Sequence, residues 1–144
     1  MRGWMAVGLA VLLALGASWT GAAAAGEPAV WSIDHVKARP GEYENYRRYL
    51  EANWVPARVE ALKRGHITSY RLLLQPQGDA NAFDFVLLTR YTDLGTYERR
   101  EALFAEVFQA IRGDRGPTLI DGKGSRDLAD IVLTRAFTEQ AGAP

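Results

Sequence analysis

The sequence predicts one α+β domain, in which a four-stranded antiparallel sheet carries two helices on one face. Three observations lead to this prediction. Segments rich in β-branched and aromatic residues alternate with two segments of helical periodicity, in the order βαββαβ. A short segment dense in Gly, Asp, Asn and Pro separates the two middle strand segments, as in a hairpin. Removing an apolar leader of 25 residues from the 144 leaves about 119, the size of one small domain.

The first 25 residues have the layout of a secretory signal peptide. Arg2 precedes an apolar run from Met5 to Leu15, and small residues follow up to Ala25. The apolar run is shorter than the roughly 20 residues that span a bilayer; an uncleaved membrane anchor is the alternative. We therefore expect cleavage after Ala25, a mature domain over 26–144, and a protein exported to the periplasm or secreted, without membrane association once the signal is removed.

The mature domain begins with a strand and a long helix. Residues 29–39 interleave β-branched and aromatic residues with polar ones, which predicts a strand. Pro40 and Gly41 turn the chain, and apolar residues then recur at helical spacing over 42–64. Gly65 suits the position after the helix, where φ is usually positive.

Pro56 lies inside this helix. Its ring clashes one turn back and it donates no backbone hydrogen bond, so we expect a kink or a restart near Asn53–Val55. Asn53 is expected to cap the new turn. A kink would lift the helix from the sheet and leave Trp54 over the gap, either as filling or as an aromatic wall of a ligand pocket.

The rest of the chain alternates in the same way. We expect strands over 66–75, 83–92 and 128–137, a helix over 94–112 capped by Asp93, and a loop over 113–127. This order is the ferredoxin-like unit, with strand order 4-1-3-2. The strands are apolar on both faces, so a second layer must cover the face without helices. In a chain this short, we expect that layer to be a second copy of the chain.

Three segments resemble the dimeric α/β-barrel superfamily: VKARPGEYENY (36–46), LKRGHITSYRLL (62–73) and FDFVLLTRYTD (83–93). The superfamily includes antibiotic-biosynthesis-type monooxygenases, polyketide cyclases and exported proteins of unknown function, and the resemblance covers 29–137. It implies a homodimer of ferredoxin-like subunits packed sheet against sheet, with a ligand between the sheet and the helices of each subunit. No enzymatic motif of the superfamily matches, so no catalytic residue follows from the resemblance.

Composition excludes several classes of function. The mature chain has 16 basic and 17 acidic residues, because the leader holds only Arg2, and this balance gives no electrostatic reason to bind nucleic acid. There is no cysteine, which excludes disulfides, thiol catalysis and thiolate metal sites. No His, Asp or Glu spacing resembles a metal site, and no cofactor motif is present. The segment 121–127 lacks the spacing of a phosphate-binding loop and is interpreted as a flexible turn or lid.

Six residues are candidates for ligand binding: Asp34, His35, Trp54, Tyr70, Tyr91 and Arg135. Charged side chains inside apolar strands are costly unless paired, so Asp34 is expected either to pair with Arg90 or Arg135 on a neighbouring strand, or to leave an arginine for an anionic ligand. The two tyrosines either add hydroxyl groups to a pocket or belong to the core, and Tyr46 and Phe85 are further candidate walls.

The two histidines of the mature chain have alternative interpretations. His35 lies beside Asp34, but adjacent strand residues face opposite sides, so the two do not form a dyad. It is interpreted either as a hydrogen-bonded structural residue at the dimer seam or as a catalytic or haem-ligating residue. His66 follows the helix end, where an imidazole can bond the last carbonyl groups.

Three classes of function therefore remain. The first is an exported dimer that binds a small, largely apolar molecule. The second is a cofactor-independent oxygenase or isomerase of the antibiotic-biosynthesis-monooxygenase type, and the third is a structural or interaction dimer without a pocket. A proton-transfer residue facing a cavity would distinguish the second class, and only Asp34, His35 and Tyr70 qualify.

Overall fold

The computed structural model describes residues 26–76 and 82–140. The expected signal peptide and most of the middle turn lie outside this range. The elements, in chain order, are β1 (Val30–Ala38), α1 (Tyr43–Tyr49), the π-helical turn η1 (Leu50–Trp54), α2 (Val55–Lys63), β2 (Ser69–Leu74), β3 (Phe85–Tyr91), α3 (Leu94–Glu98), α4 (Arg100–Arg112), α5 (Ser125–Leu128) and β4 (Ala129–Thr138).

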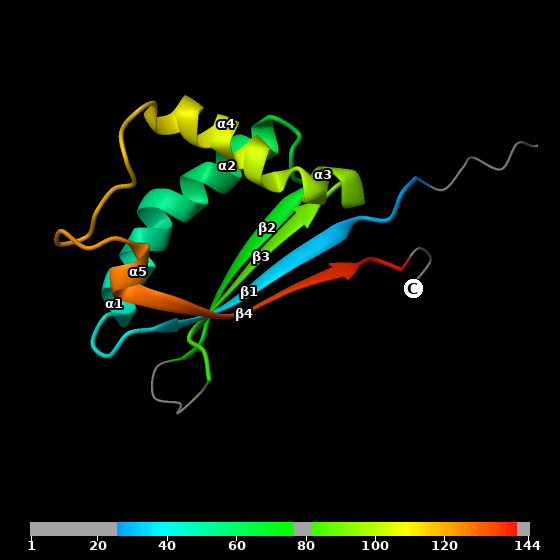
Figure 1. Cartoon of the computed structure of the whole chain (residues 1–144). Helices are drawn as coiled ribbons and strands as arrows, with labels where there is room; N and C mark the ends of the chain where they lie inside the picture. Colours follow the sequence, from blue (N-terminus) through cyan, green and yellow to red (C-terminus); the bar gives the residue numbers. More distant parts are fainter. Residues whose placement is uncertain (1–25, 77–81, 141–144) are drawn as a thin grey trace, which may run out of the picture.

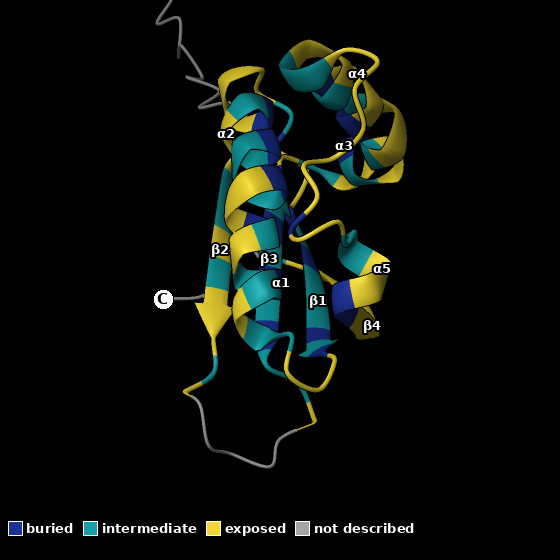
Figure 2. Cartoon of the chain, turned by 90° about the vertical axis from the view of Figure 1, so that its left-hand side faces the viewer, coloured by how far each residue is buried: buried dark blue, intermediate teal, exposed yellow. Residues whose placement is uncertain are grey.

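The predicted fold class is confirmed. All three strand pairs are antiparallel, and the strand order is β2-β3-β1-β4, which is the expected 4-1-3-2 order read from the other edge. The helices lie on one side of the sheet, with α1 and α2 running along β2 and β3 (Figures 1 and 2). In the part of the chain that the structure describes, no helix is long and apolar enough to cross a membrane.

The long helix passes Pro56 without restarting. Trp54 and Val55 keep right-handed helical torsion angles, and the Val55 N–H bonds the carbonyl of Leu50, five residues back, in a π-helical turn. The prediction that Asn53 caps a new turn is therefore wrong, because the continuous helix leaves no free N–H there. Instead the Asn53 side-chain amide is buried and forms two hydrogen bonds with the backbone of Thr118. Its Oδ1 accepts from the Thr118 N–H at 2.8 Å, and its Nδ2 donates to the Thr118 carbonyl at 2.9 Å.

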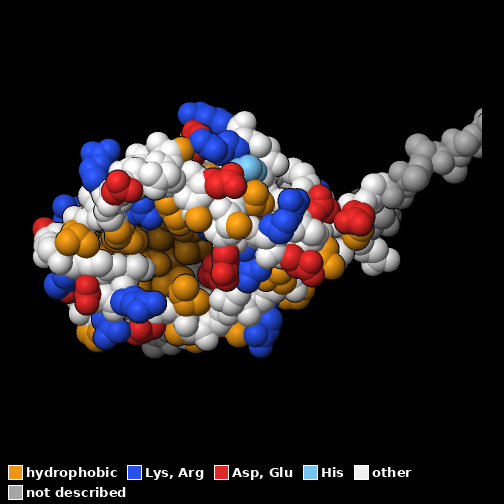
Figure 3. All heavy atoms as spheres, turned by 45° about the horizontal axis from the view of Figure 1, so that its top comes forward, with side chains coloured by type: hydrophobic (Ala, Val, Ile, Leu, Met, Phe, Trp, Pro, Cys, Tyr) orange, Lys and Arg blue, Asp and Glu red, His pale blue; other side chains and the backbone are white. Residues whose placement is uncertain are grey.

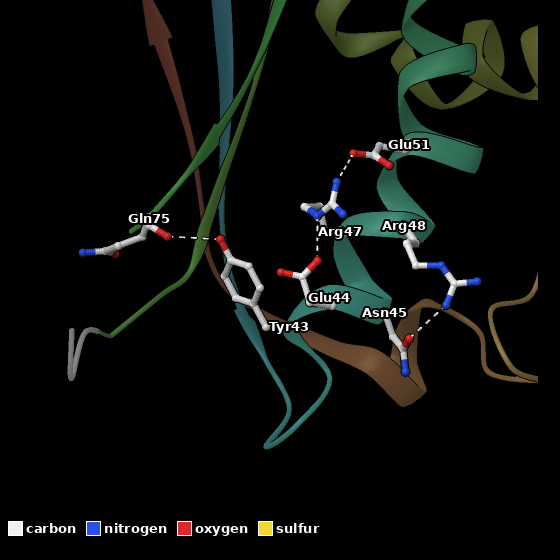
Figure 4. A network of polar contacts seen from close by, with 7 residues as sticks. All are labelled: Tyr43, Glu44, Asn45, Arg47, Arg48, Glu51 and Gln75. Atoms are coloured by element: carbon white, nitrogen blue, oxygen red, sulfur yellow. Dashed lines mark hydrogen bonds and ion pairs between the residues drawn. The ribbon is translucent and has the colours of Figure 1, made fainter. Parts of the chain in front are cut away.

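The start of the helical layer is fixed to the sheet. The Tyr43 hydroxyl donates to the carbonyl of Gln75 at 3.1 Å, and its ring stacks on Phe85 with the centroids 4.8 Å apart. Along α1 and η1, Arg47 bonds both Glu44 and Glu51 (Figure 4). These exposed ion pairs contribute little to stability, so the ring contact is the stronger anchor.

The remaining boundaries follow the sequence with two differences. Asp93 caps α3 as predicted, since its side chain accepts from the Thr96 N–H at 2.6 Å, and Gly65 has the expected positive φ of 72°. The second helix is divided at Arg99 into α3 and α4. The expected loop 113–127 contains the start of the short helix α5, and Lys123 forms an ion pair with Glu42 that ties the segment to α1.

The core lies between the sheet and the helices in two clusters. The first packs α1, η1 and α5 on β1 and β3, and includes Tyr46, Leu50 and Phe85. The second packs α2 and α4 together over the end of β3, and includes Ala57, Tyr91, Phe104 and Val107. Tyr46 and Phe85, which were candidate pocket walls, are therefore core residues.

The opposite face of the sheet is uncovered in the single chain. Alternation along β1 turns Trp31, Ile33 and His35 to this face, and the register adds Val86 and Leu88 of β3, Leu73 of β2, and Leu133 and Phe137 of β4. Leu73 and Phe137 are 51% and 54% exposed. The predicted apolar character of both faces is therefore present in the fold.

An ion pair between Arg90 and Glu139 lies at one end of this open face. Glu139 accepts from Arg90 at 2.7 and 2.6 Å and from the Trp31 indole at 2.6 Å. The bonds from Arg90, and then from Trp31, lower the pKa of Glu139 to about 2. Stability from this contact should be complete above the ordinary glutamate pKa near 4.5 and should be lost as the pH falls toward 2.

The variant Glu139→Gln is expected to make this pH dependence visible. Its free energy of unfolding should be lower than that of the wild type at pH 6, and the two should converge as the pH approaches 2, because the wild-type carboxylate then becomes neutral as well. Urea unfolding at several pH values measures the difference. A gap that stays constant from pH 6 to pH 2 would contradict the assigned contact.

Candidate functional site

A cavity of about 420 Å³ lies between the helical face of the sheet and α4. Its volume is within the usual range for small-molecule sites, roughly 300–1,000 Å³. The apolar walls are Tyr91, Phe104, Ala105 and Phe108; the polar lining residues are Ser32, Asp34, Arg58, Arg100, Glu101 and Thr134. Seen with the helices turned toward the viewer, the molecule has a hollow with hydrophobic side chains at its floor (Figure 3).

Local sequence rules place these side chains. Alternation along β1 puts Ser32 and Asp34 on the helical face together with the buried Val30. Thr134 of β4 pairs directly with Asp34. On α4, Arg100, Phe104 and Phe108 are spaced by four and form one stripe over the sheet.

Arg58 is the most unusual group in the cavity. Its guanidinium carbon lies 4.2 Å from the ring centroid of Phe104 and 4.6 Å from that of Trp54, and its Nε donates to the Thr89 hydroxyl at 3.1 Å. Across the described residues, no carboxylate lies within ion-pair distance of Arg58 (4.0 Å). Burial lowers the pKa of Arg58 to about 10, while Tyr91 and Asp34 act in the opposite direction.

Asp34 also lacks the partner that the sequence suggested. Its carboxylate accepts from the Thr134 hydroxyl at 2.7 Å. The predicted ion pair with an arginine of a neighbouring strand is wrong, because Arg90 pairs with Glu139 and Arg135 lies on the opposite face of β4. Asp34 therefore presents a charge to the cavity, with the charge of Arg58 nearby.

The six candidates of the sequence do not all meet in this cavity. Asp34 and Tyr91 line it, and burial raises the pKa of the Tyr91 hydroxyl. Trp54 and Tyr70 pack edge to face outside it, with centroids 5.6 Å apart, and Trp54 reaches the site only through Arg58. His35 and Arg135 lie on the open face of the sheet.

His66 differs from its expected hydrogen bonding, and His35 lies on the open face of the sheet. His35 packs edge to face on Phe83 with the ring centroids 4.7 Å apart, and its buried Nδ1 has no hydrogen-bond partner among the described residues. At the helix end it is the backbone N–H of His66, rather than the imidazole, that bonds the Ala61 carbonyl at 2.9 Å. Within 26–76 and 82–140, no group of three or more His, Asp or Glu side chains could hold a metal ion.

Sequence reasoning missed Arg58 and the aromatic stripe of α4 as site residues. A signal for Arg58 was present, because it follows Trp54 by four residues and a helix brings side chains at this spacing into contact. What the sequence did not show is that Phe104, almost fifty residues later, packs against the same guanidinium.

Comparison with known proteins supports the fold. No protein-family model and no curated protein matches the chain. Among solved structures, HapK from Hahella chejuensis is similar to it, with a TM-score of 0.50 and 16% sequence identity over 80% of this chain and 95% of that one. A candidate antibiotic biosynthesis monooxygenase from Chloroflexus aurantiacus J-10-fl has a TM-score of 0.48 and 11% identity, over 81% of this chain and 97% of that one. A conserved protein from Methanosarcina mazei Go1 has a TM-score of 0.45 and 15% identity, over 78% of this chain and 92% of that one. The similarity to HapK extends over most of both chains and agrees with the ferredoxin-like α+β fold described above.

Proposed function

We propose that the mature protein is an exported homodimer whose subunits each bind one small, largely apolar molecule in the cavity beneath α4. The observation that carries the proposal is the composition of that cavity. Aromatic side chains form its walls, and two charged groups, Asp34 and Arg58, project into it without pairing with each other. Small-molecule sites combine apolar walls with a few placed polar groups in this way.

The dimer is supported by the open face of the sheet. Monomeric proteins seldom expose contiguous apolar patches larger than a few hundred Å², and here the side chains of four strands contribute to one. A second copy that packs its own open face on this one would bury both. The cavity is on the other side of the sheet, so each subunit keeps its own binding site.

The binding function is tested by filling the cavity. Ala105 is an exposed residue at the cavity mouth on α4, so Ala105→Trp should occupy the space without disturbing the core. A panel of single-ring aromatic compounds, charged and neutral, is screened by calorimetry against the wild type and this variant. We expect a hit that binds once per chain and is lost in Ala105→Trp. The control, Ala110→Trp, is on an exposed part of α4 outside the cavity and should bind normally.

A second candidate function is proton transfer, as in an isomerase. The observation that favours it is that Asp34, alone among Asp34, His35 and Tyr70, lines the cavity. A carboxylate can remove the proton from a carbon next to a carbonyl group and return it to a neighbouring carbon, and the Arg58 guanidinium would stabilise the intermediate enolate. The same proton removal would begin a cofactor-independent oxygenation.

Deuterium exchange separates catalysis from binding. If Asp34 is a base, a ligand from the screen that carries a C–H next to a carbonyl group should exchange that proton with D₂O in the presence of the protein, and Asp34→Asn should abolish this exchange while the ligand still binds. NMR of the ligand measures both. If such a ligand binds but does not exchange its proton, the protein is a binding protein and not an isomerase.

Export is the remaining part of the proposal. The order of Arg2, the apolar run and the alanine-rich end supports cleavage close to Ala25. Intact-mass analysis of protein from the exported fraction should show that about the first 25 residues are missing. Recovery of the full-length chain in the membrane fraction would instead indicate an anchor.

A further inference from the structure

The two charges of the cavity are placed some distance apart. Ser32 of β1 is the direct partner of Thr89 of β3, and Asp34 follows Ser32 by two residues on the same face. Thr89 and Asp34 are therefore diagonal neighbours across the strand pair, about 7–8 Å apart. Arg58 is bonded to Thr89 of β3, and the Asp34 carboxylate is bonded to Thr134 of β4, on the other side of β1. The two charges are therefore held farther apart than the Cα atoms of this diagonal.

Each charge is fixed from one side and free on the other. Arg58 is held by its Nε and by the two aromatic rings, and its two terminal nitrogens have no hydrogen-bond partner among the described residues. Asp34 accepts one hydrogen bond, from Thr134 to Oδ1, and its Oδ2 has none in the same part of the chain. The groups that remain free are two parallel donors at one end and one acceptor at the other.

Charges without partners in a partly desolvated site are unfavourable in the empty protein. The terminal nitrogens of arginine match the two oxygens of a carboxylate in a bidentate pair. A carboxylate such as Asp34 accepts from a hydroxyl or amino group. A ligand that joins the two groups must span the distance between them less one hydrogen bond at each end, and a six-membered ring with substituents at opposite ends has this extended form. Phe104 and Phe108 lie beside the site, with ring centroids 6.1 Å apart.

We propose that the ligand is a single-ring aromatic carboxylic acid that carries a hydroxyl or amino group at the end of the ring opposite the carboxylate. Arg58 binds the carboxylate, Asp34 accepts from the hydroxyl or amino group, and the ring packs against Phe104 and Phe108. The proposal rests on the binding function proposed above, and adds the chemical class of the molecule.

Four probes test the two contacts separately: 4-hydroxybenzoate, benzoate, 4-hydroxybenzamide and benzamide. Calorimetry with the full mature chain should give the tightest binding for 4-hydroxybenzoate. Replacing the carboxylate by the amide should weaken binding about 10- to 100-fold, since a bidentate charged pair is lost. Removing the hydroxyl should weaken binding about 10- to 100-fold, the size expected for one hydrogen bond to a charged group.

Variants assign each preference to its residue. In Arg58→Met, the acid and the amide should bind with about equal affinity. In Asp34→Ala, the probes with and without the hydroxyl should bind with about equal affinity. Thermal unfolding shows whether each variant is folded, and Arg58→Met should keep the wild-type Tm or raise it, because an unpaired charge is removed. The control is Arg112→Met: Arg112 lies over Phe108 at 4.2 Å, as Arg58 lies over Phe104, but outside the cavity, so both preferences should be retained.

The results distinguish this proposal from the one on which it rests. Equal affinity for acid and amide, or an acid preference that survives in Arg58→Met, would overturn the ligand class. If none of the four probes binds but a neutral compound from the screen does, and Ala105→Trp blocks it, the ligand class is wrong and the binding function stands. If nothing binds the wild-type cavity, both are wrong.

Discussion

Replacing Phe85 with alanine is expected to lower the free energy of unfolding by about 3–5 kcal/mol. Phe85 is fully buried in the first core cluster, where its ring stacks on Tyr43 and meets the edge of Tyr46 at 5.2 Å. Alanine would leave a cavity that the strands on either side of β3 cannot close, because both neighbours are hydrogen-bonded to it. Urea unfolding followed by circular dichroism measures the loss.

The effect is large for a chain of this size. Natural domains have total stabilities of about 5–15 kcal/mol, so Phe85→Ala brings the protein close to unfolding at growth temperature. Phe85→Leu should lose much less, since most of the apolar volume remains and only the ring contacts disappear. A Phe85→Ala variant as stable as the wild type would show that this ring is not part of the core.

The double variant Leu73→Asp, Leu133→Asp is expected to convert the proposed homodimer to a folded monomer. Both leucines are on the open face of the sheet, on β2 and β4, and both are exposed in the single chain, so the substitutions should spare the fold. In a dimer they would place uncompensated carboxylates between two sheets. Burial of an unpaired charge costs several kcal/mol, and about 4 kcal/mol already weakens association roughly a thousandfold.

Light scattering at micromolar concentration should therefore give twice the mature mass for the wild type and the single mass for the variant. Leu94→Asp is the matched control, because Leu94 is 52% exposed and Leu73 51%, but Leu94 lies on α3 outside the sheet. It should remain dimeric. A wild-type chain that is monomeric and does not associate would contradict the homodimer.

The elements of this fold follow from local rules, and the sequence therefore predicted most of them. Alternation in β1 and β3, the Asp93 cap and Gly65 each depend on a few neighbouring residues. The errors came from longer-range effects. The break expected at Pro56 became one π-helical turn, because packing of the helix along β2 and β3 keeps it continuous, and Asn53 turned to the distant Thr118 instead of capping.

The site was predicted less well than the fold. Asp34 and Tyr91, two of the six candidates, line the cavity. Period-two alternation assigns strand residues to one face or the other, but it could not say which face of the sheet carries a cavity. His35 and Arg135 were grouped with them, and the register shows them on the other side. Which face of the sheet is covered depends on where the helices pack. Strands that are apolar on both faces give no information about this.

The sequence by itself determined the order of elements, the sheet topology, and the presence of two apolar sheet faces, since each is set by residue periodicity and turn chemistry along the chain. Only the tertiary structure decided that Arg58 and Asp34 share a cavity. Arg58 stands next to the buried Ala57, about 100° from the buried stripe of its helix. From that position a side chain faces solvent or a second helix, and it is the packing of α4 over the sheet, with Phe104 against the guanidinium, that encloses the charge.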